Sequence, residues 1–139
     1  MSIPETGRWS LEITLPWPPS GLSPNSVRGK NWAVVWAAAR RYKAATEAAV
    51  MDWLAAGGTR PPAGFIRAEA VFCPPNRIRR DLDGCLGAMK HALDSVAATL
   101  GVDDSVFRPW AVDFGAVVAG RGEVVLRLVA HDPAWAALD

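Results

Sequence analysis

The sequence predicts a small α+β domain, in which a mixed or antiparallel sheet of about four strands packs against two main helices. Short segments that alternate apolar and polar residues occur near both ends and in the middle of the chain, and longer segments with apolar residues every three or four positions separate them. The 139 residues are enough for one hydrophobic core. We therefore expect a single domain over residues 1–139, with peripheral tails at 1–7 and 132–139.

The composition is that of an ordinary soluble protein, with 50% hydrophobic and 21% charged residues. No run of about 18 apolar residues occurs and no apolar signal segment follows the N-terminus, so we expect a cytoplasmic protein without a membrane partner. Cys73 and Cys85 do not have the spacing of a metal or redox motif, and we expect them to be reduced and structural. His91 and His131 are far apart, and no pattern pairs them as ligands.

Residues 8–15 alternate apolar and polar side chains and predict a half-buried strand, which closely spaced prolines end. The polar loop over 20–30 is either functional or plain surface. From 31 to about 56 the chain lacks Pro and Gly and predicts a long helix capped by Asn31. We expect its aromatic stripe to serve in the core or a subunit interface rather than as a platform for stacking bases.

The second half of the chain predicts three more strands. Residues 65–73 alternate as one strand, and residues 106–118 and 123–130 are expected to form a β-hairpin around the Gly-Arg-Gly turn at 120–122. Pro109 predicts an edge position or a bulge, because proline cannot donate to a sheet ladder.

The candidate chemistry lies after the second of these strands. Asp81 and Asp83 flank Leu82, and in an extended chain residues at i and i+2 face the same side, so Leu82 can anchor in the core while both carboxylates project together. On a helix the two would be about 200° apart. We therefore expect Asp81 in extended chain and Asp83 at the N-cap of a helix that begins near Gly84, although capping alone would also explain Asp83.

These carboxylates suit Mg²⁺, which takes hard oxygen ligands and completes its shell with water or phosphate. An Asp-x-Asp pair is a weak pattern alone, but Asp103 and Asp104 follow about 20 residues later. Basic residues beside the first pair favour a phosphate group as substrate, unless they form only a solvated face. They are Arg77, Arg79 and Arg80, and a second basic zone comprises Arg28, Lys30, Arg40, Arg41 and Lys43.

Lys90 shares a helix face with Asp83, because seven residues make nearly two turns. Gly87 lies between them on that face and has no side chain, so Lys90 can lean toward the carboxylates and stabilise charge in a transition state. An ordinary ion pair of Lys90 with Asp94 is the alternative.

The third carboxylate raises a geometric conflict. A helix unbroken from 84 to 100 would be about 25 Å long, whereas six extended residues return at most about 20 Å. We therefore expect the helix to end near Ala97 or Ala98; otherwise Asp104 comes from a partner subunit.

Three segments together match a known pattern in order and spacing over residues 11 to about 129. They are Leu15-Pro16-Trp17-Pro18-Pro19-Ser20 with Asn25, Arg79-Arg80-Asp81-Leu82-Asp83 ahead of a helix containing Ala92-Leu93-Asp94, and Gly101-Val102-Asp103-Asp104-Ser105. In this combination the chain resembles the RusA family of Holliday-junction resolvases, small dimeric Mg²⁺-dependent endonucleases of bacteria and their prophages.

The resemblance implies a homodimer that binds four-way junction DNA and hydrolyses phosphodiesters by metal-activated water. It implies that Asp81, Asp83 and Asp104 bind Mg²⁺, with Mn²⁺ as a substitute, and that a lysine on the helix is catalytic. The chain departs from the pattern, with Gly84 where the family often has Asn and Gly87 where the lysine commonly lies. Lys90, one turn later, is then the candidate. DNA contacts are expected from Arg77, Arg79, Arg80, Asn25, Arg28 and Lys30.

Two other functions stay open. One is a non-catalytic dimer that binds branched DNA, and the other is a metal-dependent phosphohydrolase acting on a small molecule, which would need a shaped apolar pocket.

Overall fold

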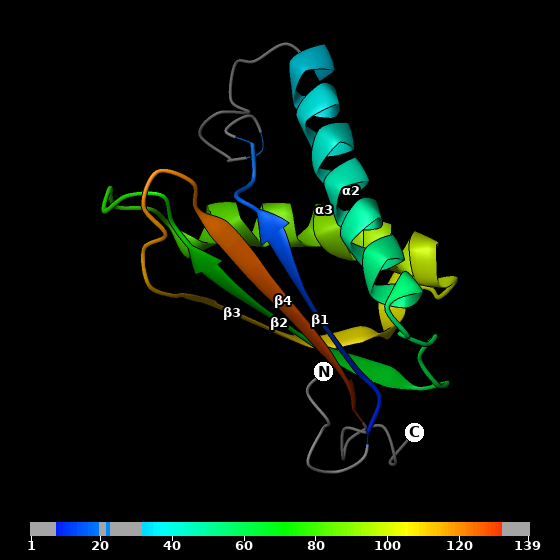
Figure 1. Ribbon diagram of the computed structural model, residues 1–139. Helices are drawn as coiled ribbons and strands as arrows, with labels where there is room; N and C mark the ends of the chain where they lie inside the picture. The colour runs from blue at the N-terminus through cyan, green and yellow to red at the C-terminus, as the bar shows by residue number, and fades with distance from the viewer. Residues whose placement is uncertain (1–7, 20–21, 23–31, 132–139) are drawn as a thin grey trace.

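The structure is a computed structural model that describes residues 8–19, 22 and 32–131, so both expected tails and the Asn31 cap lie outside the described residues. A four-stranded mixed sheet and two long helices form an α+β fold, as predicted (Figure 1). The elements are β1 (Ser10–Pro16), α2 (Trp32–Ala55), β2 (Phe65–Cys73), α3 (Leu82–Leu100), the 3₁₀ turn η2 (Asp104–Val106), β3 (Phe107–Phe114) and β4 (Glu123–His131).

The strand order is β1-β4-β2-β3, and it corrects the predicted hairpin. β4 pairs antiparallel with both β1 and β2, whereas β3 runs parallel to β2 at the edge. The segment after β3 forms hydrogen bonds with the end of β2 and the residues that follow it. Gly115 N–H donates to Phe72 O, and Val118 N–H donates to Pro74 O. This segment carries the chain around β2 to its other side, so β3 and β4 are not neighbours.

Pro109 has the role predicted for it. β3 is an edge strand, and its register against β2 shifts between Ile66 and Ala68, opposite the proline. A residue without an N–H fits this position because the ladder is already interrupted there.

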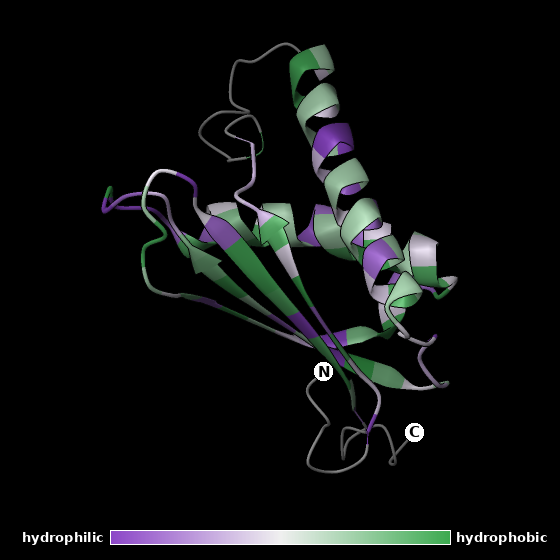
Figure 2. Cartoon of the chain, viewed as in Figure 1, coloured by the Kyte–Doolittle hydropathy of each residue, from purple (hydrophilic) through white to green (hydrophobic). Residues whose placement is uncertain are grey.

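The core lies between one face of the sheet and the two helices. Alternate residues of β1, β2 and β4 are buried, as predicted, and hydrophilic residues interrupt largely hydrophobic strands (Figure 2). The inward residues include Leu11, Ile13, Leu15, Ile66, Ala68, Ala70, Phe72, Val124, Leu126 and Leu128.

The two helices meet near the middle of α2. Ser95 Oγ on α3 donates a hydrogen bond of 2.7 Å to the carbonyl of Lys43 on α2. Tyr42, beside this contact, is buried, whereas Trp32 and Trp36 are exposed. The aromatic stripe of α2 is therefore core only in part, and its N-terminal portion is surface.

The expectation that α3 ends near Ala97 or Ala98 is wrong. The helix continues to Leu100, and Gly101 adopts φ 74° and donates its N–H to Ala97 O. The last turn stays helical because Val96, Ala97 and Leu100 are buried in the core and glycine caps the end in the left-handed conformation. No helix in the described ranges combines the length and hydropathy needed to cross a membrane.

Candidate metal and phosphate site

Asp81 and Asp83 lie at the N-terminus of α3, which begins two residues earlier in the chain than predicted. Asp81, not Asp83, is the N-cap residue, with extended φ −97° and ψ 141°, and Asp83 lies in the first turn. Leu82 is 37% exposed and does not anchor in the core, because the buried stripe of α3 begins at Cys85. The predicted extended Asp-Leu-Asp pair is therefore a cap residue followed by a helical one.

Both carboxylates are available for a ligand. Asp81 occupies the cap position but its side chain makes no hydrogen bond to the helix, so capping does not explain the aspartate. Asp81 and Asp83 are exposed. The first N–H groups of a helix lack internal partners and carry partial positive charge, which favours anionic groups at this end.

The three arginines before Asp81 do not behave alike. Arg80 turns back on its own loop and donates to Asn76 O at 3.2 Å, to Ile78 O at 2.8 Å and to Asn76 Oδ1 at 2.8 Å. Arg77 and Arg79 are exposed. Arg80 therefore shapes the loop, whereas Arg77 and Arg79 are exposed in the segment that precedes the carboxylates.

Trp17 brings the first two segments of the sequence pattern together. Its ring lies 5.2 Å from Arg80 Cζ and packs edge-on against Phe72, with ring centroids 6.1 Å apart. The chain leaving β1 then passes over α3, because a Cβ placed on Gly87 would lie 3.8 Å from Leu22 O. The chain that leaves β1 therefore lies beside the segment before α3 at Trp17 and beside α3 itself at Leu22.

Lys90 is exposed on α3. The predicted alternative, an ion pair with Asp94, is not the one formed: Asp94 Oδ2 lies 3.9 Å from Lys43 Nζ of α2. His91 lies beside this pair, and burial together with the nearby positive charge of Lys43 lowers its pKa, although Asp94 opposes the shift. Its Nδ1 is buried without a hydrogen-bond partner in the part of the chain described.

Asp104 begins η2, beyond the C-terminus of α3. Hydrogen-bonding contact with the carboxyls of Asp94 and Asp103 raises the pKa of Asp104. Asp103 accepts from Ser105 N–H at 3.0 Å, and this bond lowers its pKa. The closeness of Asp94 to Asp104 was not predicted, because it depends on the short turn at Gly101 that brings η2 back beside α3.

The helix separates the candidate ligands. Asp81 precedes α3 and Asp104 follows it, and 19 helical residues extend for about 28 Å. Among residues 8–19, 22 and 32–131, no group of three or more His, Cys, Asp or Glu side chains is placed to hold a metal ion. One chain therefore holds Asp81 and Asp83 at the start of α3, and Asp94 in contact with Asp104 near its other end.

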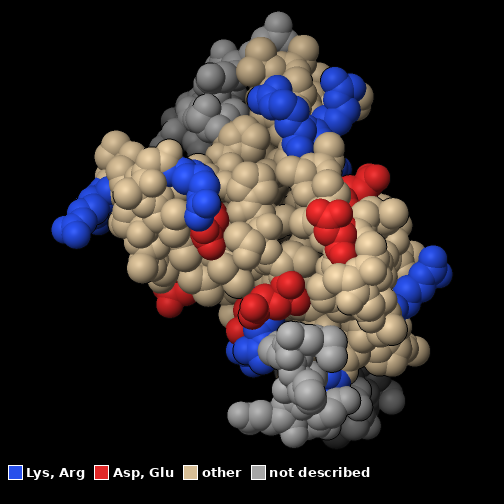
Figure 3. Space-filling view, in the orientation of Figure 1, with Lys and Arg blue, Asp and Glu red and all other residues tan. Residues whose placement is uncertain are grey.

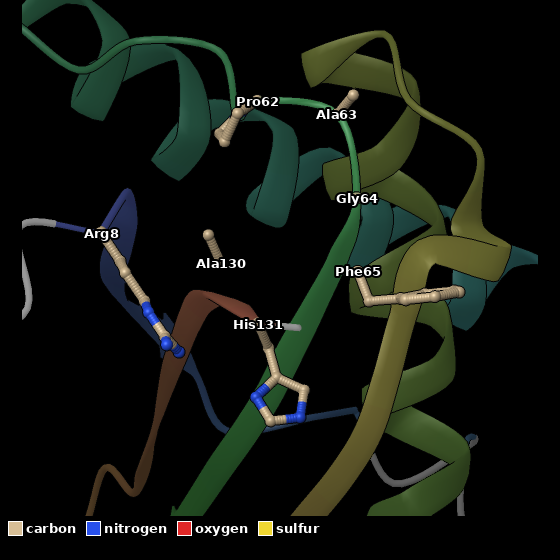
Figure 4. A pocket seen from close by; sticks show the side chains of 7 residues that line it. All are labelled: Arg8, Pro62, Ala63, Gly64, Phe65, Ala130 and His131. Carbon is tan, nitrogen blue, oxygen red and sulfur yellow. The ribbon is translucent and has the colours of Figure 1, made fainter. Parts of the chain in front are cut away.

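A cavity of about 190 Å³ opens where β2 begins and β4 ends (Figure 4). This is the other end of the sheet from Asp81 and Asp83, which follow the end of β2. Phe65, at the start of β2, and His131, at the end of β4, line it together with Arg8, Pro62, Ala63, Gly64 and Ala130. None of the candidate carboxylates contributes to this cavity. The remaining candidates, Asn25, Arg28 and Lys30, lie outside the described residues.

No protein-family model matches the chain. It is 37% identical over 101 residues to a protein of Xylella fastidiosa (strain Temecula1) whose function is uncharacterized. The match covers 68% of this chain and 61% of that protein, so the chain spans less than two thirds of its relative.

Proposed function

We propose that the protein is a Mg²⁺-dependent endonuclease that acts on four-way junction DNA as a homodimer. The observation that carries the proposal is the exposed Asp81–Asp83 pair at the start of α3, in which the cap residue does not use its carboxylate for capping. Exposed Arg77 and Arg79 stand directly before the pair. Carboxylates for a cation beside guanidinium groups for phosphate suit hydrolysis of a phosphodiester.

The donor set fits Mg²⁺. This ion is usually held by one or two carboxylates and completes its octahedron with water and substrate phosphate, so a single exposed carboxylate at the start of α3, that of Asp81 or of Asp83, is enough to begin such a site without a protein cage. When bound, Mg²⁺ supplies charge stabilisation at the phosphate and a more acidic water, and Mn²⁺ shares its preference for oxygen ligands.

A complete set of three aspartates then requires two subunits. Because α3 is unbroken, Asp104 lies about a helix length away from Asp81 in its own chain. In a two-fold dimer, each Asp81 pair can meet the Asp104 of the other chain, and the two equivalent sites suit matched nicks in a symmetric junction.

The remaining side chains have separate roles in this proposal. Arg77 and Arg79 contact phosphates and position the strand, while Arg80 holds their loop against Trp17. Lys90 is the candidate for balancing charge on the phosphate, because its hydrogen-bonding capacity is not committed to Asp94.

A small-molecule phosphohydrolase is a weaker proposal, because the described cavity lies at the opposite end of the sheet from Asp81 and Asp83. A dimer that binds branched DNA without cutting is the nearer competitor, since Gly87 stands at the usual lysine position.

The substitution Asp81→Asn tests the function. With labelled synthetic junctions and Mg²⁺, we expect the variant to lose cleavage while keeping its junction affinity, measured in EDTA. Asp52→Asn, which changes an exposed aspartate of α2, is the matched control and should cut like the wild type. Undiminished cleavage by Asp81→Asn refutes the proposal, and wild-type binding without cleavage at any Mg²⁺ concentration supports the non-catalytic competitor.

A further inference from the structure

The first turns of α2 present large apolar side chains to solvent. Trp32 is 75% exposed, Val34 49% and Trp36 57%, and the buried residues of this helix begin only at Ala38. The contact with α3 comes later still, at Lys43. The N-terminal end of α2 therefore extends past the body of the domain (Figure 1). Trp32 and Trp36 are four residues apart and so share one face of the helix, and exposed apolar groups that lie together mark interaction surfaces.

Along α2 itself, the charges nearest these tryptophans have one sign. Arg40, Arg41 and Lys43 are the first charged residues of α2, and its first acidic residue is Glu47. In Figure 3 the Lys and Arg side chains gather over the upper part of α2, with Asp and Glu lower down. The guanidinium carbon of Arg40 lies 4.8 Å from the centre of the Trp36 ring.

This charge pattern decides between two occupants. A second copy packed symmetrically here would place the basic residues of both helices together, and like charges across an interface cost affinity. A nucleic acid instead neutralises them with phosphates. Arg40 lies over the ring of Trp36, which is still 57% exposed, and an aromatic ring beside basic groups is how proteins bind unpaired bases.

We propose that the N-terminal half of α2 binds nucleic acid by stacking an unpaired base on Trp36, with Arg40 and Arg41 contacting the adjoining phosphates. This inference rests on the proposed function for the nature of the partner but not for cleavage. In this proposal α2 recognises unpaired bases, such as those at a branch point, while the residues near Asp81 contact the phosphate backbone of the nucleic acid.

The test compares Trp36→Ala and Trp36→Phe with Met51→Ala, a control at a residue of the same helix that is 54% exposed. Binding of a fluorescently labelled single-stranded oligonucleotide and of the matching duplex is measured in EDTA. We expect Trp36→Ala to weaken oligonucleotide binding by about 5- to 100-fold. Trp36→Phe should retain most of the affinity, Met51→Ala should not change it, and duplex binding should fall less.

Sedimentation of the same variants measures their oligomeric state and so tests the competing occupant, a second copy of the chain. If Trp36→Ala binds the oligonucleotide as Met51→Ala does, the inference is refuted. It is also refuted if the variant dissociates from dimer to monomer, because the surface then belongs to a second copy. Junction cleavage by the wild type in Mg²⁺ is scored separately: failure there overturns the proposed function alone, whereas unaltered binding by Trp36→Ala overturns this inference alone.

Discussion

Replacing Gly87 with lysine tests how α3 positions charge near the aspartates. Position 87 follows Asp83 by one turn, about 6 Å along the helix axis, whereas Lys90 follows it by about 10 Å. A lysine at 87 therefore brings its ammonium group much closer to the Asp81–Asp83 pair. The space exists, because a Cβ at Gly87 would meet Leu22 O at 3.8 Å, an ordinary van der Waals contact.

The stability change can be estimated from helix propensity. Glycine in a helix interior is less favourable than alanine or lysine by about 0.5–1 kcal/mol, so Gly87→Lys and Gly87→Ala should both stabilise the fold by about this amount. For a domain of this size that corresponds to a rise in melting temperature of about 2–4 °C. Differential scanning calorimetry of the two variants and the wild type measures it.

Activity separates the two substitutions, because only Gly87→Lys adds the charge. We expect junction cleavage in Mg²⁺ to increase for Gly87→Lys and to stay at the wild-type level for Gly87→Ala. If both variants are less stable than the wild type, the loop at Leu22 packs too tightly on α3 for any side chain. If both are stabilised but cleave equally, the argument about lysine placement is refuted.

Two further predictions follow from burial. Burial is the main cause that lowers the pKa of His91 below its ordinary 6.5. Between the folded-state pKa and 6.5, the unfolded chain therefore binds more protons than the folded chain. The contribution of a neutral His91 to stability is therefore complete above pH 6.5 and is lost as the pH falls through the folded-state pKa. From pH 7.5 to 5.5, the melting temperature of the wild type should drop more steeply than that of His91→Gln. Parallel curves for the two proteins would contradict this. Burial raises the pKa of Cys85, although the charge of Arg80 opposes the shift in part. A thiol reagent at pH 8 should therefore modify the half-buried Cys73 before Cys85. If Cys85 in the Cys73→Ser variant reacts at the rate of a free thiol, this prediction is wrong.

Local patterns predicted most of the fold. Strand alternation located β2 at its observed bounds, and the helical spacing of 31–56 located α2 to within a residue at each end. Such signals depend on which residues face the core, and a periodic segment carries that information itself. The edge position of Pro109 could also be predicted locally, because a proline lacks the N–H that a central strand needs.

The errors concern contacts between distant segments. The turn at 120–122 is real, but nothing in it shows that β3 pairs with β2 while β4 crosses to the other side. Similarly, the need to bring Asp104 to Asp81 within one chain suggested a short α3, whereas burial of Leu100 extends the helix. The sequence singled out Asp81 and Asp83 as candidates, but their position at the cap and first turn depended on where the buried stripe of α3 begins.

Complementation between two inactive variants tests the central claim, that a complete aspartate set spans two chains. Asp81→Asn and Asp104→Asn subunits carrying different tags are co-expressed, and the mixed dimer is purified through both tags. If the set is shared, one site combines both substitutions while the other keeps Asp81 of one chain and Asp104 of its partner. We predict that the mixed dimer nicks junctions at about half the wild-type rate, without paired cuts, although each variant alone is inactive. A mixed dimer as inactive as its parents would contradict the shared site.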